Sequence, residues 1–166
     1  MRYFDIAMFE VDPKLQTRLG YYKIHAANKD IYVSTSLPDA TSYKPCIVLS
    51  SDQETLIRAV REANTIGIII EGSEPSKKVI GKAKEYGKTV FIPAGKLTAS
   101  PSGARQPILR GLRKIFFASH AIKAKTALVS MASSRNQLLS SAQMMEIANL
   151  ISRGQAQAGL FGGKIL

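Results

Sequence analysis

The chain has 166 residues, of which 45% are apolar, as expected for one folded domain with a buried core. Its apolar runs are far too short to span a bilayer, which excludes a membrane-spanning protein, and its single cysteine, Cys46, excludes an intrachain disulfide. Acidic residues interrupt the start of the chain where a signal peptide would be apolar, so we expect a cytoplasmic protein.

The net charge of +11 is unevenly distributed along the sequence. Residues 1–60 contain seven Lys or Arg and seven Asp or Glu, whereas residues 87–166 contain eleven Lys or Arg and one acid, Glu146. Such asymmetry favours a polyanion-binding face. The apolar residues of the basic half are committed to a core rather than left free to insert, so nucleic acid is favoured over a membrane surface.

The first part of the chain predicts a strand followed by a helix. Residues 3–9 alternate and are rich in strand formers. Asp12 and Pro13 are an N-cap and first-turn pair, and we expect the helix that they begin to run to about Asn28, with His25 on one face. Residues 31–35 predict a short strand, and residues 37–43 a loop.

The middle of the chain alternates between apolar strands and polar helices. Strands are predicted over residues 45–49, 66–70 and 89–92. Ser51 to Glu54 have the pattern of a capping box, beginning a helix to about Asn64. A short basic helix is predicted over residues 73–86, with Gly87 as its C-terminal cap. Residues 93–104, rich in Pro, Gly and Ser, predict a long loop.

The most informative stretch is 103–132, where a basic amphipathic helix runs into a buried strand over 127–131. This helix is predicted to have an apolar face and, opposite to it, a basic face with Phe117 beside it. The apolar set is Ile108, Leu112, Ile115, Ser119 and Ile122. The basic set is Arg110, Arg113 and Lys114, with Arg105 ahead of the helix and Lys123 and Lys125 after it.

Ser140 or Ser141 is expected to cap a last helix over residues 142–151. Strands that alternate with helices indicate a parallel α/β domain over residues 1–153, followed by a glycine-rich tail over 154–166. Periodicity leaves open whether the sheet is an open doubly wound one or a small barrel.

The sequence offers little support for self-sufficient catalysis. His25 and His120 are isolated from each other and from acids, so no metal site is predicted. No nucleophile motif accompanies the serines of residues 130–141. An alternative is a small enzyme acting on a phosphorylated substrate, in which backbone N–H groups of the 93–104 loop and Lys96 bind the phosphate.

The basic helix and its surroundings resemble the C-terminal half of ribonuclease P protein component 3, the archaeal relative of a eukaryotic ribonuclease P/MRP subunit. The matching pieces are ARQPILRGLRKI, the strand ALVSMASS, and LLSSAQMMEIANLI, and the opening YFDIAM is similar to the family's start. The sequence departs from the family at Ala7, where an asparagine is usual, and at Ser140-Ser141-Ala142, where a cation is usual.

The resemblance implies a distorted, incomplete TIM-like (β/α) barrel, similar to the metal-dependent phosphoesterase barrels but without their histidines. It implies an RNA-binding subunit that binds no cofactor itself and assists ribonuclease P RNA, with Mg²⁺, in removing the 5′ leader of precursor tRNA. A second protein subunit is the implied partner. The implied RNA contacts are Arg105, Arg110, Arg113 and Lys114, with Lys96, Lys123, Lys125 and Arg135 as further candidates.

Overall fold

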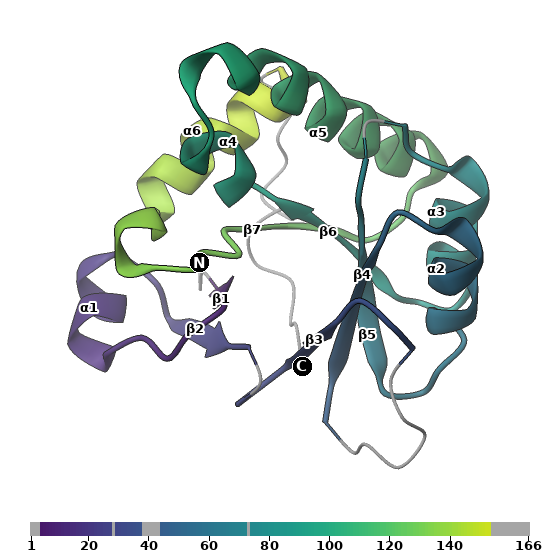
Figure 1. The fold of residues 1–166 in the computed structure, drawn as a ribbon, viewed down its shortest axis with the longest axis horizontal. Coiled ribbons are helices and arrows are strands. Elements are labelled where there is room, and N and C mark those ends of the chain that lie inside the picture. Colours follow the sequence, from purple (N-terminus) through teal and green to yellow (C-terminus); the bar gives the residue numbers. More distant parts are fainter. Residues whose placement is uncertain (1–3, 28, 38–43, 73, 154–166) are drawn as a thin grey trace.

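The computed structural model describes residues 4–27, 29–37, 44–72 and 74–153. The strands in these ranges are β1 (Phe4–Ala7), β2 (Lys23–Ala26), β3 (Tyr32–Ser34), β4 (Cys46–Ser50), β5 (Thr65–Ile70), β6 (Thr89–Pro93) and β7 (Thr126–Val129). The helices are α1 (Pro13–Arg18), α2 (Gln53–Ala59), α3 (Lys77–Glu85), α4 (Gly95–Ala99), α5 (Ser102–Ile122), the 3₁₀ turn η1 (Arg135–Gln137) and α6 (Ser141–Ser152). The alternation of strands and helices confirms the α/β class (Figure 1).

The strands form a five-stranded parallel sheet, in the order β3-β4-β5-β6-β7, and a parallel pair, β1-β2. The two sheets meet where β1 continues beside the end of β7. There the N–H of Met131 donates to the Ile6 carbonyl over 2.9 Å, and the N–H of Met8 donates to the Ala132 carbonyl over 2.8 Å. A bridge between Ala27 and Ile31 also links the ends of β2 and β3.

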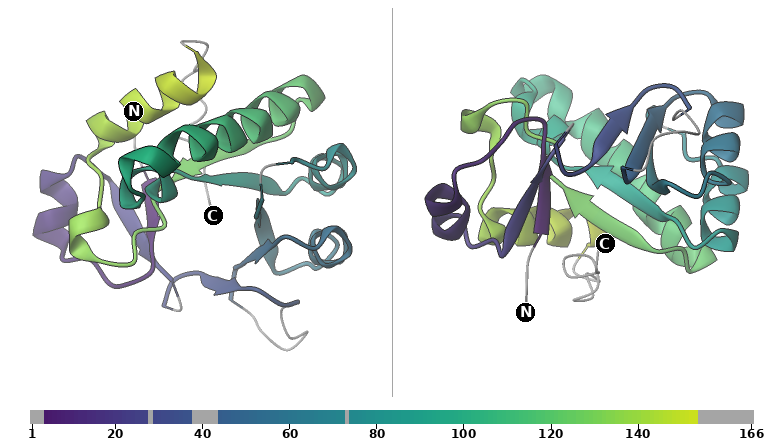
Figure 2. Two further views of the ribbon diagram at one scale, coloured as in Figure 1. Left: turned by 45° about the horizontal axis from the view of Figure 1, so that its top comes forward. Right: turned by 90° about the horizontal axis from the view of Figure 1, so that it is seen from below.

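Side chains alternate between the two faces of the strands, and this builds two apolar layers. One layer is enclosed by the strands and consists of Ile6, Ile31, Ile47, Ile69, Phe91 and Val129. The other faces α2, α3, α5 and α6, which lie outside the strands (Figure 2). Both faces are therefore buried, which explains why β4, β5 and β6 have nearly continuous apolar sequences.

The first helix is shorter than the sequence predicted. Asp12 caps it as expected, accepting from the N–H groups of Lys14 and Leu15 at 2.8 and 3.2 Å. The helix ends at Arg18, however, because Gly20 takes a φ of 81° that stops it. His25 therefore lies on the buried strand β2, and the predicted helix face through residue 26 is wrong.

Three other boundaries differ from expectation. Asp52, not Ser51, caps α2, since its carboxylate accepts from Glu54 N and Thr55 N. Ser76 caps α3, so this helix begins later than residue 73. The predicted loop 93–104 is instead mostly helical, with α4 at its centre and the first turn of α5 at its end. The predicted loop over 37–43 and the predicted tail 154–166 lie largely or wholly outside the described residues.

Other predictions are confirmed. The strands predicted from the apolar runs are present, Gly87 follows α3 with a φ of 67°, and Ser140 with Gln143 forms a capping box for α6. Cys46 is buried on β4, and its burial raises the pKa of the thiol to about 11. Within the described ranges, no helix combines the length and the hydropathy that crossing a bilayer would take.

Candidate nucleic-acid interface

Helix α5 presents its apolar side to the core, as the sequence predicted. Leu112, Ile115 and Ser119 are buried there, together with Phe116. Gly111 is buried as well. With one side of the helix fixed in this way, Arg110 and Lys114 are exposed on the outside. No acidic residue occurs anywhere in α5, so the helix contributes positive charge alone.

Arg113 of the predicted basic face has a structural partner. Its Nε and Nη2 donate to the carbonyl of Leu150 at 3.0 and 2.8 Å. Leu150 lies in the last turn of α6, where carbonyls lack partners within the helix. Arg113 therefore joins α5 to the end of α6, which leaves less of its guanidinium for an external anion.

Lys96 and Lys114 form ion pairs with two acids that follow β5. Lys96 Nζ lies 3.0 Å from Glu71 Oε1, and Lys114 pairs with Glu74. All four side chains are substantially exposed, so each pair contributes little stability, about 0–1 kcal/mol. An approaching polyanion has to compete with these carboxylates for the lysines.

Three other predicted residues are less engaged. Arg110, Lys123 and Lys125 are exposed, and none of the ion pairs within the described residues involves them. Arg105 lies within the first turn of α5, not ahead of the helix as predicted; it is also exposed, but its Nε donates to the Ser100 carbonyl over 3.0 Å. The structure thus places Arg110 and Lys114 on one helix and Lys123 and Lys125 at its C-terminal end.

Phe117 and His120 help to pack α5. Phe117 is half-buried against the core and lies edge-on to Phe116, with 5.3 Å between ring centroids. The His120 ring stacks on Phe116 at 6.0 Å, and its carbonyl accepts from the N–H of Lys123. Phe117 therefore contributes to the packing of α5.

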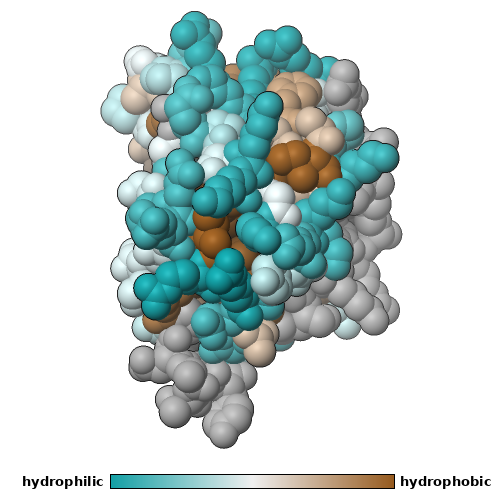
Figure 3. Space-filling model, turned by 90° about the vertical axis from the view of Figure 1, so that its right-hand side faces the viewer, coloured by the Kyte–Doolittle hydropathy of each residue, from teal (hydrophilic) through white to brown (hydrophobic). Residues whose placement is uncertain are grey.

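Helix α3 packs beside α5 and carries further lysines that the sequence did not connect with α5. Its Lys77, Lys78 and Lys84 are exposed, while Lys82 pairs with Glu85 at 2.6 Å. The side of the molecule that carries α2 and α3 is mostly hydrophilic, with small apolar areas (Figure 3). The spacing of the lysines on an amphipathic helix was visible in the sequence. That this helix packs beside α5 was not.

Arg135 lies elsewhere. It lines a cavity of about 440 Å³ that is formed by the segment after β1 and by α1, and that contains no residue of α5. The predicted set of eight cations is therefore not one continuous site. A separate and mainly apolar cavity of about 300 Å³ lies between α5 and the ends of β5 and β6, with Lys96 in its lining.

The acidic and imidazole groups of the first strands are buried. Burial raises the pKa of the Asp5 carboxyl to about 6, although bonds from the N–H groups of Ser130 and Ile6 act against it. Burial lowers the pKa of His25, and nearby Lys23 lowers it further. Across the described residues, no group of three or more His, Cys, Asp or Glu side chains could hold a metal ion.

Comparison with known proteins supports the fold of this chain but does not assign it to a family. No family model matches the chain, and no curated protein matches it. Among solved structures, the crystal structure of an uncharacterized protein superposes with a TM-score of 0.50 and 13% sequence identity. That match covers 68% of this chain but only 30% of the other, so it supports the α/β fold alone.

Proposed function

We propose that this protein is an RNA-binding subunit of ribonuclease P that assists the catalytic RNA in removing the 5′ leader of precursor tRNA. The observation that supports it is the acid-free helix α5, which is held to the core on one side and carries exposed Arg110 and Lys114 on the other. The neighbouring helix α3 adds further exposed lysines, Lys77, Lys78 and Lys84. Several cations on one surface bind phosphates together, and each contact releases counterions.

The proposal includes a more specific fold, an incomplete TIM-like barrel. Its support is the pair of links between the two sheets, at Ala7 with Ala132 and at Ala27 with Ile31. The enclosed layer, which takes a residue from each of β1, β4, β5, β6 and β7, is also what the interior of a closed sheet requires. Seven described strands, rather than eight, make such a barrel incomplete.

In this proposal the polypeptide works in the cytoplasm with ribonuclease P RNA, precursor tRNA and another protein subunit, and without a membrane. The Mg²⁺ required for hydrolysis belongs to the RNA-containing holoenzyme. The contacts we assign to RNA are first Arg110, Lys123 and Lys125, which form no ion pair within the described residues, and then Lys114, Arg105 and Lys96, which have protein partners. Arg113 contributes mainly by fixing α5 against α6.

The test is a salt titration of RNA binding with two matched variants. Arg110→Gln/Lys125→Gln removes two exposed cations of the proposed surface, and Arg61→Gln/Lys44→Gln removes two exposed cations from other elements. The slope of log K against log salt falls by about 1.5 in the first variant and by much less in the second. Equal slopes in the two variants would show that RNA binds elsewhere.

Reconstitution tests the ribonuclease P assignment itself. Precursor tRNA cleavage is measured with ribonuclease P RNA and its companion proteins, with this chain present, omitted or replaced by the Arg110→Gln/Lys125→Gln variant. We expect omission to slow cleavage and the variant to act at higher RNA concentrations only. No change on omission would refute the assignment and leave a general RNA-binding protein.

An enzyme acting on a phosphorylated substrate remains the second proposal, favoured by the 300 Å³ cavity at the ends of β5 and β6. Parallel α/β folds place ligands at such ends. Lys96 is the cation that would meet a phosphate there, once released from Glu71. A phosphorylated ligand that raises Tm in the parent but not in Lys96→Gln would support this function.

A further inference from the structure

A second positive site lies beside β1 and is independent of the α5 surface. Its cavity, of about 440 Å³, is lined by Phe9, Glu10, Val11, Asp12, Lys14, Leu15, Arg18 and Arg135. The cavity is within the size range of small-molecule sites, roughly 300–1,000 Å³. It opens beyond the C-terminal ends of β1 and β7, the edge at which parallel α/β folds place ligands.

Three cations reach this cavity from two distant parts of the chain. Lys14 and Arg18 come from α1, and Arg135 comes from η1, after β7. All three are exposed, and within the described residues none of their charged groups takes part in a hydrogen bond or ion pair. The fold therefore brings together three cations without giving them a protein partner.

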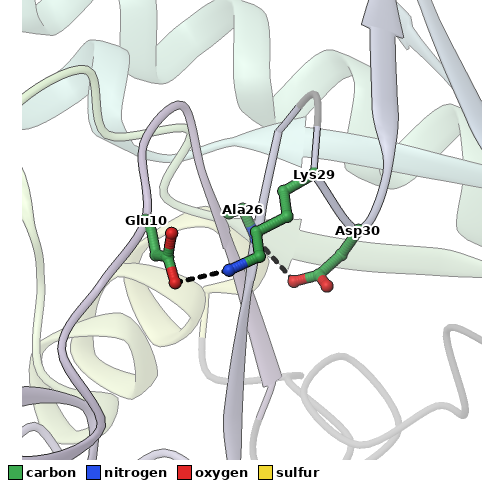
Figure 4. A network of polar contacts seen from close by, with 4 residues as sticks. All are labelled: Glu10, Ala26, Lys29 and Asp30. Carbon is green, nitrogen blue, oxygen red and sulfur yellow. Dashed lines mark hydrogen bonds and ion pairs between the residues drawn. The ribbon is translucent and has the colours of Figure 1, made fainter.

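The two acids of the cavity already have partners. Glu10 accepts from Lys29 Nζ over 2.6 Å, and this contact raises the pKa of the lysine (Figure 4). Asp12 accepts from the backbone N–H groups of Lys14 and Leu15 as the cap of α1. With these carboxylates engaged, the cavity keeps an excess of positive charge for a bound anion.

The rest of the lining fits more than an inorganic ion. Phe9 is half-buried beside Leu15, and Val11 is buried, so an apolar wall stands against the cations. Arg and Lys bind phosphate, and an aromatic ring stacks on a base. These two chemistries occur together in a nucleotide.

We propose that this cavity binds a nucleoside monophosphate unit, with its phosphate on Lys14, Arg18 and Arg135 and its base against Phe9. The unit is either a free nucleotide or the phosphorylated end of an RNA strand. The site does not depend on the ribonuclease P proposal, because no residue of the α5 surface contributes to it.

The experiment is calorimetric titration of the full chain with adenosine 5′-monophosphate, adenosine, inorganic phosphate, and a short RNA with or without a 5′-phosphate. We expect adenosine 5′-monophosphate or the 5′-phosphorylated RNA to bind more tightly than adenosine, phosphate or the unphosphorylated RNA. Binding of the mononucleotide identifies a free ligand, and binding of the phosphorylated RNA alone identifies an RNA end.

Matched variants assign the binding to the cavity. Lys14→Gln/Arg18→Gln is expected to weaken binding at least about tenfold, whereas Arg61→Gln/Lys44→Gln leaves it unchanged. Phe9→Leu should reduce the preference for nucleotide over inorganic phosphate. The proposal is overturned if no phosphorylated probe binds, if the Lys14/Arg18 variant binds as the parent does, or if phosphate binds as tightly as the nucleotide.

Discussion

The backbone N–H of Ser130 donates to Oδ1 of Asp5 over 2.7 Å, across 125 residues of sequence. The same oxygen accepts from Ile6 N at 2.8 Å, while Oδ2 has no partner within the described residues. One carboxylate oxygen thus fastens the first strand to the end of the last one. The bond lies between the two sheets, where the fold depends on few backbone contacts.

The burial of Asp5 makes stability depend on pH. Its carboxyl pKa rises from an ordinary value of 3.8 to about 6. The folded state therefore retains the proton more readily, so this group's contribution to the free energy of unfolding is complete below pH 4. It is lost as pH rises through 6, by about 3 kcal/mol.

Asp5→Asn removes this titration while keeping an acceptor for Ser130 N–H. We expect the stability of the variant relative to the parent to improve by about 2 kcal/mol between pH 4 and pH 7, because part of the total is already lost at pH 4. Urea denaturation at the two pH values measures it. A difference that stays constant with pH would contradict the assignment of the titration to Asp5.

His25 is expected to act in the opposite direction. Burial lowers the pKa of its imidazole below the ordinary 6.5, so the folded state resists protonation. Its contribution to stability is present above pH 6.5 and is lost as pH falls toward the lowered pKa. His25→Phe should remove this loss in acid, measured as a smaller decrease in Tm below pH 6.5 than the parent shows.

Two glycines give a matched pair of substitutions. A methyl group at Gly67 of β5 would collide with the Thr89 carbonyl and the Phe91 ring, whereas one at Gly81 of α3 meets no atom within 4 Å. Gly67→Ala should lower the free energy of unfolding by about 2–3 kcal/mol. Gly81→Ala should raise it by about 0.5–1 kcal/mol, because alanine loses less backbone entropy in a helix.

A substitution at Arg113 distinguishes the role of this residue in packing from a role in RNA binding. Arg113→Lys keeps the charge but loses the forked contact to the Leu150 carbonyl, so we expect stability to fall by about 1 kcal/mol. The salt dependence of RNA binding should remain close to that of the parent. Thermal denaturation measures the change in stability, and a salt titration of the same sample measures the change in RNA binding. A large change in the salt slope would show that Arg113 contacts RNA.

Local signals in the sequence were sufficient for most elements. Apolar runs such as Ile66 to Ile70 predict buried strands because both faces of β5 are covered. The strand β2 was missed because the Asp12 cap was followed by residues compatible with a longer helix. Gly20 was the available stop signal, and only its φ of 81° establishes it as the end of α1.

The sequence was sufficient to predict which residues of the candidate interface are exposed on α5, but not which of them have partners elsewhere in the chain. The buried and exposed sides of α5 follow from helical spacing, which needs only the sequence. The partners of Arg113 and Lys114 lie 37 and 40 residues away, at Leu150 and Glu74, and nothing in local spacing indicates them. The convergence of Arg135 with Lys14 and Arg18 likewise depends on the pairing of β1 with the end of β7.

That pairing has a consequence during synthesis of the protein. Strands β3 to β7 can add to one another in the order in which they leave the ribosome, because each lies beside its successor. The β1-β2 pair is made before these five strands, yet one of its neighbours, Ala132, is made more than a hundred residues later. The β1-β2 pair must therefore keep an open edge until β7 and the residues that follow it have been made.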